Sequence, residues 1–172
     1  MSQIAQPTPG RPYMPDGYGL PTTDDGLLPW SYAEQRLTQS KNYWVCSVRP
    51  DGRPHSVPVW AAWVDGALYY DGAPDTIHNR NIIVNPNVSV HLEDGAQVVI
   101  FEGVVQAIAK PERALAERVA EVFRGKYADS GYAPQADQWD SSGPGGLYVI
   151  KPKRVLAWTK FPTDCTRWTF KS

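Results

Sequence analysis

The stretch that decides the fold runs from Gly52 to Gly72 and reads GRPHSVPVWAAWVDGALYYDG. Its two apolar segments, residues 57–64 and 67–71, are rich in the β-branched and aromatic residues that favour strands. Asp65-Gly66 between them is the two-residue connection typical of a β-hairpin. Pro58 cannot donate a hydrogen bond to a neighbouring strand, so we expect the first strand to be bulged or at a sheet edge there. The stretch therefore predicts an antiparallel hairpin.

The strand pattern continues on both sides of this hairpin and is interrupted by three helical patterns. Turns such as Pro50–Arg53 and Asp94-Gly95 join neighbouring strands, which makes these strands mostly antiparallel. Gly103 is expected to mark a bend in its strand. We expect strands at 43–49, 57–64, 67–71, 87–93, 97–109 and 147–158, and helices at 30–40, 74–84 and 111–128. Six such strands close most easily into a barrel. The expected fold class is therefore mainly β, a six-stranded and mostly antiparallel β-barrel with flanking helices.

The length of 172 residues predicts a single domain preceded by an arm. Residues 1–26 are rich in proline and glycine and have no apolar period, which is typical of a flexible arm. Residues 27–172 then form the barrel domain. Within it, residues 129–145 are a loop rich in Gly, Pro and Ser and are a candidate lid.

Composition and charge exclude several classes of function. The net charge of -1 comes from 17 basic and 18 acidic residues, so a nucleic-acid partner is not expected. No apolar run reaches the roughly 20 residues that cross a bilayer, and the start does not resemble a secretory signal. We therefore expect a cytoplasmic protein with no membrane partner, in which Cys46 and Cys165 stay reduced. The seven Trp and nine Tyr suit subunit interfaces and ring-shaped ligands.

Catalytic motifs that rely on a side-chain nucleophile or a metal are missing from the sequence. It contains no Gly-x-Ser-x-Gly elbow, no Cys-x-x-Cys pair, no His-Glu-x-x-His and no dinucleotide or Walker loop. The histidines His55, His78 and His91 are not spaced as metal ligands, so no metal is expected. Catalytic residues stay unknown at this stage.

Three further motifs accompany the central stretch. They are TIHNRNI at residues 76–82, NPNVSV at residues 85–90, and Glu102-Gly103. In this order and spacing they resemble the pyridoxamine-phosphate-oxidase-like split barrel. More narrowly, they are similar to its flavin/deazaflavin oxidoreductase branch of actinobacteria. The resemblance covers about residues 30–170 and includes the closing segment Thr166–Phe170.

This resemblance implies a homodimer with two cofactor sites at the subunit interface, where a flavin-type ring lies between subunits. The reaction it implies is hydride transfer to an unsaturated small molecule. The phosphate of the cofactor is placed near the second and third strands and the helix that follows them. The residues that the resemblance places at the cofactor are Val57, Pro58, Val59, Trp60, Thr76, His78, Arg80 and Asn81.

The residue types are compatible with these roles. A helix start offers free N–H groups to a phosphate, Thr76 adds a hydroxyl, and Arg80 adds a guanidinium of matching shape. Trp60 is a candidate wall of the ring pocket, and His78 is the nearest titrating candidate for a proton donor. Each residue also has a plain structural alternative, namely a helix cap for Thr76, a solvated arginine for Arg80, a core residue for Trp60 and a surface histidine for His78.

The sequence also departs from the family pattern. Members that bind FMN tightly carry basic residues at positions occupied here by Val57, Ala62, Ile77 and His78. This loss favours coenzyme F420 over FMN, because a larger ligand distributes its affinity over a long tail. Two alternatives stay open, an FMN-dependent enzyme on the same fold and a non-catalytic binder of flavin, deazaflavin or haem.

Overall fold

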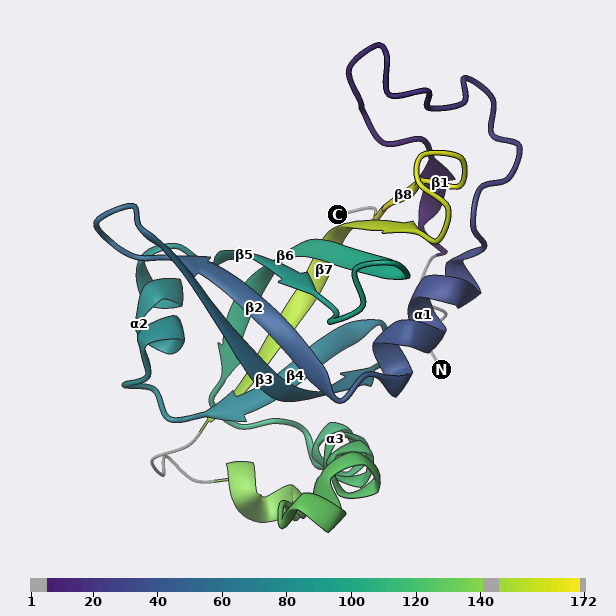
Figure 1. Cartoon of the computed structure of the whole chain (residues 1–172). Helices are drawn as coiled ribbons and strands as arrows, with labels where there is room; N and C mark the ends of the chain where they lie inside the picture. The colour runs from purple at the N-terminus through teal and green to yellow at the C-terminus, as the bar shows by residue number, and fades with distance from the viewer. Residues whose placement is uncertain (1–5, 141–145, 171–172) are drawn as a thin grey trace.

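The computed structural model describes residues 6–140 and 146–170, and its core is a closed antiparallel barrel (Figure 1). Strand pairing runs β7-β4-β3-β2-β5-β6, and β6 pairs with β7 to close the ring. Every pairing is antiparallel. The elements are β1 (Thr8–Gly10), α1 (Trp30–Gln39), β2 (Asn42–Val48), β3 (Pro54–Val64), β4 (Ala67–Gly72), α2 (Ile77–Val84), β5 (Asn87–His91), β6 (Val98–Ile108), α3 (Arg113–Tyr127), 3-10 turns at Ala128–Ser130 and Ala136–Trp139, β7 (Gly146–Trp158) and β8 (Thr166–Thr169). The expected six-stranded barrel with flanking helices is confirmed.

Two short strands lie outside the six-stranded ring. β8 extends the sheet beyond β7, and β1 pairs with β8 through Thr8 to Gly10. Neither strand was expected, because each is too short to carry a periodic pattern. The division of the chain at residue 26 stays a prediction, and so does the flexibility of the arm.

Helix boundaries differ from the expected ones for a local reason. The helix expected at 74–84 begins at Ile77, and Thr76 occupies the capping position in extended conformation. The helix expected at 111–128 likewise begins at Arg113, after Glu112 as cap. Pro74 and Pro111, with which the two expected ranges begin, therefore lie in the loops before these caps, where proline also fits.

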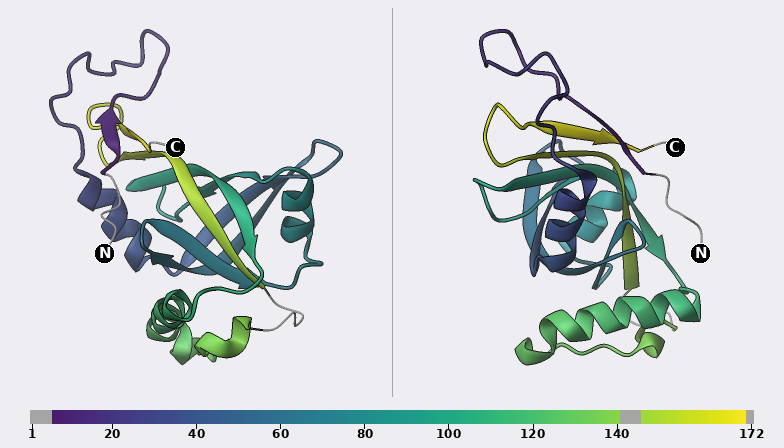
Figure 2. Two further views of the ribbon diagram at one scale, coloured as in Figure 1. Left: turned by 180° about the vertical axis from the view of Figure 1, so that it is seen from behind. Right: turned by 90° about the vertical axis from the view of Figure 1, so that its right-hand side faces the viewer.

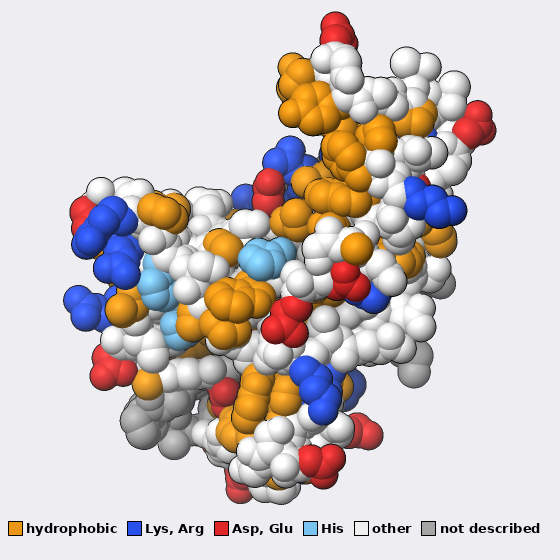
Figure 3. Space-filling view, viewed as in Figure 1, with side chains coloured by type: hydrophobic (Ala, Val, Ile, Leu, Met, Phe, Trp, Pro, Cys, Tyr) orange, Lys and Arg blue, Asp and Glu red, His pale blue; other side chains and the backbone are white. Residues whose placement is uncertain are grey.

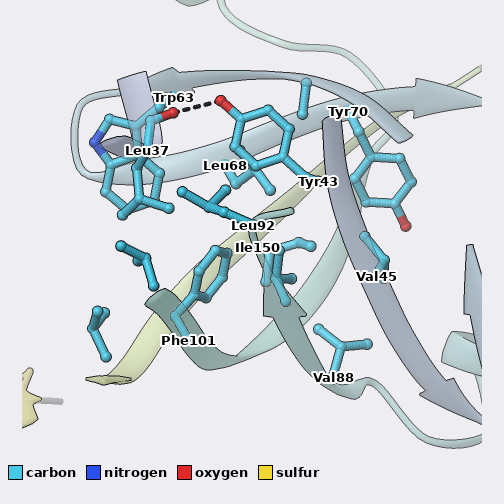
Figure 4. Close-up of a cluster of buried hydrophobic side chains, with 14 of the residues drawn as sticks. Leu37, Tyr43, Val45, Trp63, Leu68, Tyr70, Val88, Leu92, Phe101 and Ile150 are labelled. Atoms are coloured by element: carbon cyan, nitrogen blue, oxygen red, sulfur yellow. Dashed lines mark hydrogen bonds between the residues drawn. The ribbon is translucent and has the colours of Figure 1, made fainter. Parts of the chain in front are cut away.

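Two hydrophobic clusters hold the barrel and its helices together. The first fills the barrel interior, where Tyr43, Tyr70 and Phe101 are almost fully buried and Tyr43 donates a hydrogen bond to the Leu37 carbonyl of α1 (Figure 4). The second lies between α3 and the outer face of β3, β4 and β7, where Phe123 is fully buried. In Figure 2, α3 crosses one end of the barrel, and β1 and β8 lie at the opposite end.

A bulge in β6 bends the wall of the barrel. The β6–β7 register shifts between Glu102 and Gly103, as the sequence predicts for Gly103. A Cβ atom at Gly103 would lie 2.5 Å from the Lys151 carbonyl oxygen, so only glycine allows β7 to approach this closely. Among the described residues, no helix is long and apolar enough to span a membrane.

Candidate functional site

The candidate site lies along the first half of β3, which has a strand partner on one side only. β3 pairs with β2 along its first half, but β4 pairs with β3 only over Ala61–Val64. The stretch Pro54–Trp60 is therefore an edge on the β4 side, which confirms the expectation drawn from Pro58. An edge strand presents backbone N–H and C=O groups without a strand partner. We call this stretch the β3 edge.

A cavity of about 330 Å³ lies against the β3 edge. The end of β4 borders it on one side and α2 borders it on another. The chain leaves the sheet after Gly72, forms α2, and returns to the sheet at β5. The residues that line this cavity are Pro58, Val59, Trp60, Asp71, Gly72, His78 and Tyr132. We call it the ring cavity.

Trp60 forms an aromatic wall of the ring cavity. Its side chain is 39% exposed, and its ring is stacked on Tyr127 of α3 at 4.8 Å and 9°. Tyr127 is fixed in turn, because its hydroxyl donates to the Lys41 carbonyl and accepts from the Ala61 N–H. The indole is thus rigidly supported on one side while its remaining surface stays open to a ligand.

A polar network lines the cavity next to Trp60, where the Tyr132 ring lies 5.9 Å from the Trp60 ring. The Tyr132 hydroxyl donates to the Asp71 carboxylate, and the Gln138 amide donates to the same carboxylate at 3.3 Å. Burial, together with the hydrogen bond to Asp71, raises the pKa of Tyr132, so the phenol keeps its proton at neutral pH. This network holds the segment after α3 against the end of β4.

His78 contributes an imidazole side chain to the lining of the ring cavity. Its Nε2 lies 3.4 Å from the Thr76 hydroxyl, and its ring lies 6.0 Å from that of Tyr70. Burial lowers the pKa of His78, and the neighbouring His55 lowers it further. The imidazole is therefore neutral at pH 7 and can donate one hydrogen bond and accept another.

Arg80 and Asn81 face a different part of the molecule. Both line a second cavity of about 610 Å³, on the side of α2 that faces the β2–β3 turn. The Asn81 side chain is buried and donates to the Ser47 hydroxyl at 2.9 Å, so it anchors α2 to β2. Arg80 is exposed.

The structure thus divides the eight residues that the sequence pointed to. Pro58, Val59, Trp60 and His78 meet in the ring cavity, and Thr76 contacts His78 beside it. The other three do not line this cavity, since Arg80 and Asn81 line the second one and Val57 lines neither. Binding of a cofactor by any of the eight stays a prediction.

Sequence reasoning missed three residues of the ring cavity, Asp71, Gly72 and Tyr132. Asp71-Gly72 ends a predicted strand, and its position before the motif at 76–82 was a usable signal. The sequence around Tyr132 carried no such signal, because the position of Tyr132 depends on how the chain folds back after α3. The loop expected at 129–145 contains Tyr132 and a 3-10 turn, and its residues 141–145 lie outside the described part of the chain.

One face of the sheet continues from the ring cavity over the outside of the barrel. On β2 the residues alternate, so that Tyr43, Val45 and Ser47 are buried while their neighbours point outward. Trp44 lies opposite Pro58 on β3 and His91 on β5, and its ring stacks on His91 at 6.1 Å and 2°. We call this surface the outer sheet face; it consists of Trp44, Cys46, Pro58, Trp60, His91 and Ile100. Figure 3 shows hydrophobic and histidine side chains gathered over it.

Comparisons with known proteins place the fold. The profile described as "Pyridoxamine 5'-phosphate oxidase" matches residues 32–159. No curated protein sequence matches the chain significantly. A conserved hypothetical protein of Mycobacterium tuberculosis superimposes with a TM-score of 0.62 at 26% identity, over 78% of this chain and 86% of that one.

Two further solved structures share the fold at lower identity. One, named an F420 reductase, has a TM-score of 0.57 at 23% identity and covers 74% of this chain and 98% of its own. The other is HutZ, the haem storage protein of Vibrio cholerae, with a TM-score of 0.54 at 17% identity, over 72% of this chain and 87% of its own.

Proposed function

From the premise that the chain belongs to the pyridoxamine 5'-phosphate oxidase family, we propose that it is an oxidoreductase that binds a flavin-type cofactor in the ring cavity. The preferred cofactor is coenzyme F420, and the reaction is hydride transfer to an unsaturated small molecule. The observation that carries this proposal is the ring cavity itself, in which a supported indole lies beside a free strand edge.

The residues present fit a planar ring system. Trp60 offers an aromatic surface, and the backbone groups of the β3 edge offer hydrogen bonds to ring heteroatoms. A ligand pocket typically measures about 300–1,000 Å³, so a cavity at the low end and open to one side suits a site that a second subunit completes. When bound, a reduced deazaflavin would supply the hydride, and the second hydrogen would enter the product as a proton.

Side chains of the ring cavity would position the cofactor and the substrate, and Tyr132 would retain its phenol proton. Tyr132 stays protonated and donates its hydroxyl proton to Asp71, which holds the segment after α3 beside the cavity. His78 is neutral and lies beside Thr76, so this pair can bind a polar group by hydrogen bonds rather than by charge.

The preference for F420 is supported by the charges of the ring cavity. None of the described residues that line it is a lysine or arginine, and Asp71 contributes a carboxylate. Of the positions where tight FMN binders carry cations, Ala62 is buried under α3 and Ile77 faces the second cavity. A phosphate in the ring cavity would therefore lack a permanent positive partner. The structural relative named an F420 reductase is consistent with this preference.

We propose a second copy of the chain as the partner of the outer sheet face. Trp44 and Trp60 expose aromatic surface on the outer side of the barrel. In the described part of the chain, α3 covers this same side next to Trp60, over Ala62, β4 and β7, and leaves Trp44 and part of Trp60 accessible. Pro58 and Trp60 belong to both the outer sheet face and the ring cavity. A subunit seated on this face would therefore also close the open side of the cavity, as the family resemblance implies.

The absorption spectrum of the purified protein and a titration with F420 test the proposed function. We expect a protein that is colourless as purified and quenches the fluorescence of added F420, with weaker binding of FMN measured side by side. A yellow protein with flavin absorbance would favour the FMN-dependent alternative, and a Soret band would favour a haem-binding protein. Absence of binding to all three would overturn the assignment.

A further inference from the structure

The second cavity is lined by three arginines that the proposed function does not use. Arg49 and Arg53 come from the β2–β3 turn, and Arg80 comes from α2. Among the described residues that line this cavity, Asp51 is the only acidic one. In Figure 3, basic side chains gather at this end of the molecule, beside α2 and the turn. We call this space the arginine cavity.

The local charge balance leaves positive charge without a partner. Asp51 is paired with Arg53 at 2.8 Å. Within the described part of the chain, neither Arg49 nor Arg80 forms an ion pair with a carboxylate. The Nε of Arg49 is buried and has no hydrogen-bond partner there. A buried donor without a partner is unfavourable, so an acceptor that reaches this nitrogen would bind favourably.

The backbone holds the turn in one conformation. The Arg49 N–H donates to the Arg53 carbonyl, and the Gly52 N–H donates to the Arg49 carbonyl, both at 2.9 Å. Gly52 has a φ of 85°, which glycine adopts without strain. Two of the three arginines thus start from a fixed hairpin turn and the third from a helix anchored by Asn81, which reduces the ordering cost of binding.

Apolar side chains border the guanidinium groups. Ile77, Ile83 and Val84 line the cavity, with exposed fractions of 47%, 78% and 64%. Arginines beside exposed aliphatic groups suit a molecule that carries several anionic groups on a short carbon backbone, because guanidinium groups match phosphate and carboxylate oxygens in shape.

From this geometry we propose that the arginine cavity is a binding site for a phosphate- or carboxylate-bearing anion, held by Arg49, Arg53 and Arg80. The site is separate from the ring cavity, although both border α2 through the adjacent residues Ile77 and His78. The anion can therefore come from the tail of the cofactor bound next door or from a separate molecule.

Calorimetric titration of the full chain with inorganic pyrophosphate tests the site directly. We expect Arg49→Gln and Arg80→Gln each to weaken pyrophosphate binding at least tenfold, because each removes a charge-assisted contact. The matched control is Arg113→Gln on α3, an exposed arginine that pairs with Glu117 away from the cavity, and it should change the affinity less than twofold. Circular dichroism and thermal melting establish that the variants are folded. Absent pyrophosphate binding, or binding that neither variant weakens, would overturn the site.

A second arm of the experiment identifies the source of the anion. Binding of F420 is compared with binding of the same deazaflavin without its anionic tail, in the wild type and in Arg80→Gln. Weaker binding of F420 alone would assign the cavity to the cofactor tail. Unchanged binding of both, with pyrophosphate binding lost, would assign it to a separate anion. If the wild type binds neither deazaflavin, the proposed cofactor is wrong, while the pyrophosphate titration still decides the arginine cavity.

Discussion

At the scale of single residues, the stacking of Trp60 on Tyr127 is the feature most open to a direct test. Trp60→Ala removes the exposed indole but leaves the Tyr127 hydrogen bonds in place. Because aromatic stacking contributes about 0.5–1.5 kcal/mol, we expect cofactor affinity to fall about two- to tenfold. Fluorescence titration measures the change. Tyr13→Ala, at a residue 91% exposed on the N-terminal segment, is the control and should bind as the wild type does.

Lys126 gives a prediction on pH. Its Nζ donates to the Ser40 carbonyl and the Tyr43 hydroxyl, both at 2.7 Å, and burial lowers its pKa from 10.5 to about 8. A lysine whose pKa is lower in the folded state loses its proton there first, so folding becomes more favourable as pH rises from 8 toward 10.5.

The pH dependence is measured against a variant that cannot titrate. We expect the unfolding free energy of the wild type, minus that of Lys126→Met, to rise by about 1–2 kcal/mol between pH 7.5 and 10, less than the full shift because the ammonium is partly solvated. Urea denaturation of both proteins gives the difference between their unfolding free energies at each of the two pH values. The same rise with pH is expected when Lys126→Gln replaces Lys126→Met as the reference. A free-energy difference that does not change with pH would contradict the burial of Lys126.

Sequence reasoning reached some residues of the site and missed others for a physical reason. Pro58 and Trp60 were named because the family resemblance places them at the cofactor, and the irregularity of the strand at Pro58 was expected because proline chemistry is a local property. Arg53 ends the predicted turn Pro50–Arg53 and Arg49 ends the strand predicted before it, and nothing local shows that these two residues face the same helix as Arg80. Tyr132 reaches Asp71 across 61 residues, a separation at which a sequence pattern carries no information on contact.

At the scale of elements, the bulge in β6 explains why one glycine is needed in the barrel wall. Gly103→Ala would place a Cβ atom 2.5 Å from the Lys151 carbonyl oxygen, so β6 and β7 must move apart. We expect a loss of about 2–4 kcal/mol in unfolding free energy, measured by denaturant titration. Gly125→Ala on α3, where a Cβ meets nothing within 4 Å, is the control and should not destabilise the protein. Equal stability of the two variants would contradict the close approach.

Strands and helices were predicted more reliably than their ends. The six barrel strands and the helices at 30–40 and 111–128 follow from apolar patterns that each long element carries over several residues. The helix at 74–84 was instead predicted from Pro74 and from the helical spacing of Thr76, Arg80 and Asn81. β1 and β8 are only three and four residues long, so their pairing depends on the finished barrel rather than on a pattern of their own.

At the scale of the whole molecule, the outer sheet face makes a prediction on assembly. Trp44→Glu puts a charge in the centre of this face, and we expect it to convert a dimer into a monomer in light scattering at micromolar concentration, because an unpaired charge in an interface is costly. Ile83→Glu changes an equally apolar but more exposed residue on α2 and should leave the dimer intact. A wild-type monomer would remove the second subunit from the proposed cofactor site.

The prolines of the β3 edge restrict what the site can admit. Proline is tolerated in a paired strand where its nitrogen faces away from the partner, so Pro54 and Pro58 leave two gaps in the row of donors on the free side. An incoming polypeptide would need regular donors to add itself as another strand, whereas a flat small molecule needs only one or two. The two prolines therefore disfavour strand-by-strand polymerisation of the protein through the β3 edge. A compact heterocycle can still bind to this edge.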